Sequence, residues 1–174
     1  NDHSLVIDAD TDKVVDGIGV GIQRVSMVMD KYDKIWVVTD GGYHGSPYGH
    51  TTPSLYKIDA PTRIIEKEFA FDRSDSPSAM CMNGARDTLY LVNKAVWRMD
   101  VTEEFFPPEP FVTLKDVNFY GVGVDPVTSE VYASDAIDYV QSGIVYRYDP
   151  EGKLLDNFRA GMSPGAFCLN THQD

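Results

Sequence analysis

Short runs of alternating apolar and polar residues fill this chain, and Gly, Pro, Asn or Asp residues separate them. β-Branched and aromatic side chains are concentrated in the runs, which is typical of short β-strands. One alternating phrase that closes on aspartate recurs four times: Ser4-Leu5-Val6-Ile7-Asp8, Leu55-Tyr56-Lys57-Ile58-Asp59, Val96-Trp97-Arg98-Met99-Asp100 and Val145-Tyr146-Arg147-Tyr148-Asp149. The closing aspartates are 51, 41 and 49 residues apart. The pattern therefore predicts a repeated unit built from strands.

A second sequence motif recurs at a similar spacing and has an aromatic residue at positions 36, 90 and 132. Between the two phrases lie two more strand-like runs, which in the second unit are residues 63–71 and 78–82. Four short strands in a repeat of this length are typical of a β-propeller blade. We predict an all-β fold of four-stranded antiparallel blades in a single partial propeller domain. The predicted blades are residues 4–53, 54–93, 94–142 and 143–170.

The fourth predicted blade has only three strand-like runs, the last of which reaches Leu169, and three residues precede the first strand phrase. An unpaired strand edge invites pairing with another chain. We therefore expect about three and a half blades that form part of a larger, seven-bladed propeller. The expected partner at the open end is the missing N-terminal half of that propeller or a second copy of this chain.

The formal net charge is -12 at pH 7, and 20 of the 27 acidic residues are aspartates. Nine of these aspartates lie at predicted strand ends or turns, where aspartate accepts hydrogen bonds from its own turn. Such an acidic chain disfavours nucleic acid and anionic membrane surfaces as partners. No apolar run approaches the roughly 18 residues of a membrane-spanning helix, so we predict no transmembrane segment.

The two cysteines occupy the same place in two repeat units. Ser76-Pro77-Ser78-Ala79-Met80-Cys81 aligns with Ser163-Pro164-Gly165-Ala166-Phe167-Cys168. Two blades apart, their Cα atoms would exceed the roughly 7 Å limit for a disulfide. We predict that both are buried apolar residues of strands.

Two long loops carry the candidate ligand-binding residues. The first, residues 40–53, holds Tyr43, His44, Tyr48 and His50 among four glycines, a composition suited to stacking on a sugar, peptide or aromatic ligand. The alternative is that these tyrosines pack on the neighbouring blade. The histidines could also bind a metal with an aspartate, but their spacing does not require one, and we predict no metal site.

The second loop, residues 135–142, brings two carboxylates within three positions, beside Tyr139 and Gln141. Such a pair could serve acid–base chemistry, or it could fix the turn by accepting backbone N–H groups, which is the interpretation we prefer for Asp135. In a propeller, both loops open on one face with residues 71–77, 116–120 and 159–164. The predicted ligand-binding set is Asp40, Tyr43, His44, Tyr48, His50, Asn118, Tyr120, Asp138, Tyr139 and Gln141.

Several loop phrases resemble the YncE-like propellers of gut Bacteroidota: Val38-Thr39-Asp40-Gly41-Gly42, Ser46-Pro47-Tyr48, Val124-Asp125-Pro126, Ser134-Asp135-Ala136-Ile137-Asp138-Tyr139-Val140-Gln141 and Pro164-Gly165-Ala166-Phe167-Cys168. The resemblance covers residues 4–170. It implies a propeller of the surface-layer type that is secreted, periplasmic or exposed on the outer membrane, with this chain as its C-terminal half. It supplies no catalytic residues.

Two functions compete on these observations. The first is a non-enzymatic binding or scaffold module that presents its loop-rich face to a glycan, peptide or protein and needs no cofactor. The second is a calcium-dependent hydrolase like the lactonases and gluconolactonases. Such an enzyme needs carboxylates that converge on one ion, and no glutamate lies near a predicted loop of this face. The sequence also lacks the Gly-x-Ser-x-Gly, Walker and His-Glu-x-x-His motifs. We therefore favour the first function.

Overall fold

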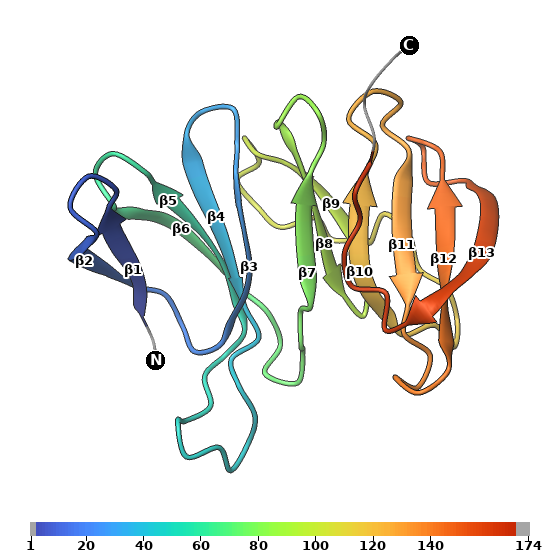
Figure 1. The fold of residues 1–174 in the computed structure, drawn as a ribbon, viewed down its shortest axis with the longest axis horizontal. Coiled ribbons are helices and arrows are strands. Elements are labelled where there is room, and N and C mark those ends of the chain that lie inside the picture. The colour runs from blue at the N-terminus through green and yellow to red at the C-terminus, as the bar shows by residue number, and fades with distance from the viewer. Residues whose placement is uncertain (1–2, 170–174) are drawn as a thin grey trace. The chain divides into compact units, whose positions relative to one another are not determined.

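The computed structural model of the chain describes residues 3–169, and within them it is all-β, without helices (Figure 1). The strands are β1 (His3–Asp8), β2 (Lys13–Gly19), β3 (Arg24–Met29), β4 (Lys34–Thr39), β5 (Ser54–Asp59), β6 (Ile65–Ala70), β7 (Ala79–Met82), β8 (Thr88–Asn93), β9 (Ala95–Asp100), β10 (Phe119–Val124), β11 (Val131–Asp135), β12 (Ser142–Tyr148) and β13 (Leu154–Met162). In this part of the chain no helix is long and apolar enough to cross a membrane.

The chain divides into two compact units, each with two antiparallel sheets. Unit 1 (Asn1–Ser76) contains the hairpin β1-β2 and the four-stranded sheet β3-β4-β5-β6. Unit 2 (Pro77–Asp174) contains the three-stranded sheet β7-β8-β9 and the four-stranded sheet β10-β11-β12-β13, drawn orange to red in Figure 1. Within every sheet, neighbours in space are neighbours in sequence, as expected for the blades of a β-propeller.

The repeat predicted from the sequence is confirmed by strand register. The three recurring aromatic residues lie on the second strand of their sheets, and each faces a basic residue on the third. The pairs are Trp36 with Lys57, Tyr90 with Arg98, and Tyr132 with Arg147. Equivalent sequence positions therefore occupy equivalent places in three sheets.

The predicted blade boundaries do not coincide with the sheets. The boundary at 53/54 separates β4 from β5, yet these strands form a continuous ladder from Lys34–Asp59 to Thr39–Ser54. The boundary at 93/94 likewise separates β8 from β9, and that at 142/143 falls inside β12. Each sheet with three or four strands begins two strands later than predicted, because the connections after β4, β8 and β11 close hairpins within a sheet. Whether both units belong to one domain remains a prediction.

Two segments that could have completed further strands are irregular. Residues 101–118, which follow β9, form only an isolated bridge between Val112 and Val96. Pro107, Pro108 and Pro110 explain this, since proline lacks the N–H that a ladder needs. The expected strand reaching Leu169 is also absent, and residue 170 of the last predicted blade lies outside the described residues.

Apolar side chains between the sheets form the core of each unit. In unit 1, Val20, Val37, Tyr56 and Ile58 make one buried cluster. In unit 2, the buried cluster joins β8 and β9 to β10, β11 and β12 through residues such as Tyr90, Val122 and Tyr148. Stacking of neighbouring sheets is the packing expected of propeller blades.

Aspartates at the strand ends fix the turns, as the sequence predicted. Asp125 Oδ1 accepts hydrogen bonds from the N–H groups of Val127 and Thr128 at 2.8 and 2.9 Å, and Asp149 Oδ1 accepts two from its own turn. Turn geometry thus accounts for much of the acidity of the chain.

The prediction for the cysteines is half right. Cys81 lies on β7 and is mostly buried, and this burial raises the pKa of its thiol to about 12. Cys168 is exposed, because residues 163–169 form no strand that would bury one of its faces.

Candidate functional site

The first loop, residues 40–53, joins β4 to β5 in unit 1 and is held close to the segment before β3. Gly41 donates its N–H to Ile22 O at 3.2 Å and accepts from Thr51 N at 2.9 Å. Its φ is +75°, and a Cβ there would lie 2.2 Å from Thr51 O, so this position requires glycine. Asp40 Oδ1 accepts the N–H of Gly42 at 2.8 Å, which gives this predicted ligand residue a structural role in the turn.

A cavity of about 420 Å³ opens between this loop and the end of the preceding connection. It is lined by Ile22, Gln23, Arg24, Tyr43, Ser46 and Tyr48. Tyr43 and Tyr48 are 63% and 76% exposed, so neither ring is buried against a neighbouring sheet within the described residues. The volume falls in the range of small-ligand pockets.

The rings of the two histidines of this loop contact each other. Their rings lie edge to face with centroids 6.5 Å apart. His50 O accepts a hydrogen bond from Arg73, and its Nδ1 is buried without a hydrogen-bond partner. Among residues 3–169, no three His, Cys, Asp or Glu side chains gather closely enough to hold an ion.

The second loop belongs to unit 2 and places its carboxylates on backbone donors. Asp135 is buried, and its Oδ1 accepts the N–H groups of Asn118 at 3.1 Å and Ile137 at 2.7 Å. This confirms the turn-fixing interpretation of Asp135. Asp138 accepts from the Gln141 side-chain amide at 2.8 Å and from the N–H groups of Val140 and Gln141. These donors lower the pKa of Asp138 to about 2, so it stays ionised and is a poor general acid or base near neutral pH.

An aromatic residue of the second loop contacts one from the preceding segment, residues 116–120. The rings of Tyr120 and Tyr139 are edge to face with centroids 5.6 Å apart, and Tyr139 remains 55% exposed. Arg159, which lies on β13, donates to Ser142 O at 2.7 Å, so the C-terminal half of β13 lies beside the end of the second loop. The loop segments expected to gather in unit 2 are therefore together.

Unit 1 shows the corresponding arrangement. Phe71 N donates to Pro53 O at 2.9 Å, and Arg73 donates to His50 O at 3.3 Å, so the segment that directly follows β6 lies beside the first loop.

Sequence reasoning missed Gln23 and Arg24, which line the cavity beside the two tyrosines. Gln23 ends the segment that links β2 to β3, and Arg24 is the first residue of β3; residues 71–77 lie in the equivalent link between β6 and β7. The repeat could have identified these two residues, because the connections between the second and third strands of each predicted unit were expected on the same face as the long loops.

No protein-family model matches this chain, and no curated protein matches it. Several solved structures share its fold. A quinoprotein alcohol dehydrogenase-like protein from Bacteroides thetaiotaomicron is 14% identical, with a TM-score of 0.58 over 78% of this chain and 33% of that one.

Dihydro-haem d1 dehydrogenase NirN, solved in complex with DHE, is 12% identical, with a TM-score of 0.64 over 94% of this chain and 34% of its own. A functionally unknown protein from Desulfotomaculum acetoxidans is 14% identical, with a TM-score of 0.57 over 91% of this chain and 49% of its own. The chain thus spans a third to a half of the length of these proteins. At such identities the likeness shows the fold alone: this chain consists of blades of a β-propeller.

Proposed function

We propose that this protein is a non-enzymatic binding propeller of the bacterial cell surface or periplasm, and that the cavity of the first loop binds a glycan. The observation that carries the proposal is the cavity of about 420 Å³ with two largely exposed tyrosines at its rim. The location rests on the resemblance to surface-layer-type propellers.

The chemistry of the lining suits a sugar. The faces of Tyr43 and Tyr48 can stack on the C–H surface of a pyranose ring. Gln23, Arg24 and Ser46, which also line the cavity, offer donors and acceptors for hydroxyl groups. A rigid sheet below a loop of this kind is a common way to present a binding surface.

The carboxylates near the loops support binding over hydrolysis. Asp40, Asp135 and Asp138 each accept hydrogen bonds from backbone N–H groups of their own loops. These bonds occupy oxygen atoms that a calcium-dependent lactonase would need for its ion.

We also propose that the two units belong to one larger propeller, completed at its open end by the missing N-terminal half or by a second copy. β1 pairs with β2 alone within the described residues, whereas its repeat equivalents β5 and β12 pair on both sides. Nearby in unit 1, Leu5, Ile7 and Met27 are 60–64% exposed. A soluble monomer of this chain that fails to bind an apolar dye such as anilinonaphthalene sulfonate would contradict this proposal.

A glycan microarray tests the binding function. The 174-residue chain should bind a defined group of glycans, and Tyr48→Ala should weaken that binding by tenfold or more. Tyr32→Ala is the matched control, because Tyr32 is also exposed (53%) but lies in the turn at the other end of β4. Loss of binding in both variants, or no binding of the wild-type chain to any glycan on the array, would refute the glycan site.

A further inference from the structure

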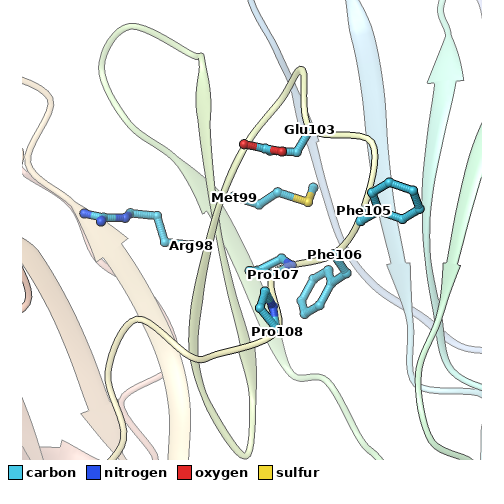
Figure 2. Close-up of a pocket in the computed structure, with 7 residues that line it drawn as sticks. All are labelled: Arg98, Met99, Glu103, Phe105, Phe106, Pro107 and Pro108. Atoms are coloured by element: carbon cyan, nitrogen blue, oxygen red, sulfur yellow. The ribbon is translucent and has the colours of Figure 1, made fainter.

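The segment that replaces the fourth strand of sheet β7-β8-β9 forms a second pocket. Residues 103–110, here called the insert, carry the sequence Glu-Glu-Phe-Phe-Pro-Pro-Glu-Pro. The chain that contains the insert leaves β9 after Asp100. It returns to β9 at Val112, whose backbone N–H and C=O both form hydrogen bonds with Val96. Between these two points it stands off from β9 and encloses a cavity of about 260 Å³ (Figure 2).

Most of the residues that line this cavity are apolar, and the two charged ones are Arg98 and Glu103. Met99, only 3% exposed, points from β9 toward the insert, where Phe106, Pro107 and Pro108 also line the cavity (Figure 2). The ring of Phe106 packs on Trp97 with centroids 5.2 Å apart. Trp97 is itself anchored by a 2.9 Å hydrogen bond from Nε1 to Asn93 O. These contacts give the pocket a preformed shape.

One charged side chain on the insert adds polarity to this pocket. Glu103 lines it, and its backbone N–H is fixed by a 3.1 Å bond to Asp100 O, while within residues 3–169 its carboxylate has no hydrogen-bond or ion-pair partner. Phe105, 82% exposed, stands on the same insert.

The guanidinium of Arg98 does not neutralise Glu103. It donates to Pro150 O at 2.6 Å and lies over the Phe111 ring at 4.2 Å. Figure 2 shows Arg98 pointing away from β9 on the side opposite to Met99.

We propose that this pocket binds the basic side chain, lysine or arginine, of a partner polypeptide. The apolar stem of such a side chain would cover Met99, Phe106 and Pro107. Its cationic end would meet the carboxylate of Glu103 and the exposed ring of Phe105. The site is separate from the loop cavity of unit 1 and does not depend on glycan binding.

A matched pair of small probes tests the site. N-acetyl-lysine-methylamide and its norleucine analogue share the same apolar stem and differ in the terminal ammonium. In titrations of the whole chain labelled at methionine methyl groups, the lysine probe should shift the Met99 signal saturably. The norleucine probe should bind at least fivefold more weakly, and 0.5 M NaCl should reduce this difference.

Two variants distinguish the effect of the Glu103 charge on binding from an effect on folding. Glu103→Gln keeps the shape of the side chain and should weaken lysine binding roughly fivefold, or about 1 kcal/mol, while leaving norleucine binding unchanged. Glu151→Gln, an exposed glutamate on the β12–β13 turn, is the control and should bind like the wild type. Equal binding of the two probes, an unshifted Met99 signal, or equal effects of both variants would overturn the proposal.

Discussion

The buried carboxylate of Asp30 should be among the most sensitive positions of unit 1. Asp30 ends the strand phrase of β3 and is fully buried. It accepts three hydrogen bonds: from Tyr32 N at 2.8 Å, from Lys34 N at 3.0 Å and from Trp36 Nε1 at 2.9 Å. Asp30→Ala would leave the indole N–H of the equally buried Trp36 unpaired, which costs about 2 kcal/mol. The two turn N–H groups are partly exposed and recover water, so they add only about 1 kcal/mol, and the expected total is about 3 kcal/mol.

Asp8→Ala is the matched control for this substitution. Asp8 also accepts three hydrogen bonds, from Asp10 N, Thr11 N and Thr11 Oγ1, but at the surface. Water can replace its carboxylate, so its loss should cost much less.

Urea unfolding at 25 °C, followed by far-UV circular dichroism, measures both variants. Trp36→Phe removes the indole donor, so in the double variant the Asp30→Ala step should cost about 1–2 kcal/mol less than it does alone. If Asp30→Ala costs no more stability than Asp8→Ala, or if the effects of Asp30→Ala and Trp36→Phe are additive, the buried hydrogen bond to the indole is not what makes Asp30 important.

Three further outcomes follow from the same structure. The Lys34 ammonium, 2.6 Å from Asp59, lowers the pKa of the Asp59 carboxyl to about 2. The ionised Asp59 therefore stabilises the fold above pH about 4, and this stabilisation is lost as the pH falls toward 2. The melting temperature of Lys34→Met should change less over this pH range than that of the wild type. Iodoacetamide at pH 8 should modify Cys168 rapidly and Cys81 only on unfolding, because burial raises the pKa of Cys81 to about 12; equal rates by mass spectrometry would contradict this. Calcium should leave the melting temperature unchanged if the protein is a binding module, whereas a saturable rise would revive the lactonase alternative.

The candidate site was only partly readable from the sequence. Aromatic and glycine content pointed to the first loop, and Tyr43 and Tyr48 do line its cavity. Gln23 and Arg24 were missed, because they lie where the connection from β2 enters β3, some twenty residues earlier in the chain, and carry no distinctive local pattern. Asp40 and Asp138 were included as ligand residues, yet their side chains hold their own turns. An aspartate in a loop has the same local sequence signature in both roles.

The sequence alone determined where most of the strands lie, because strand propensity, alternation and turn chemistry are local properties; the expected strand that reaches Leu169 is the exception. It also determined that Trp36, Tyr90 and Tyr132 are equivalent, since an approximate repeat preserves equivalence. Only the tertiary structure decided how the strands group into sheets. The sequence of a four-strand repeat has the same period whichever strand is taken as the first of a sheet. Which strand is the first depends on which neighbouring strands pair through backbone hydrogen bonds. Burial was decided in the same way: Cys81 and Cys168 share one sequence phrase, but only Cys81 has neighbouring strands that exclude water.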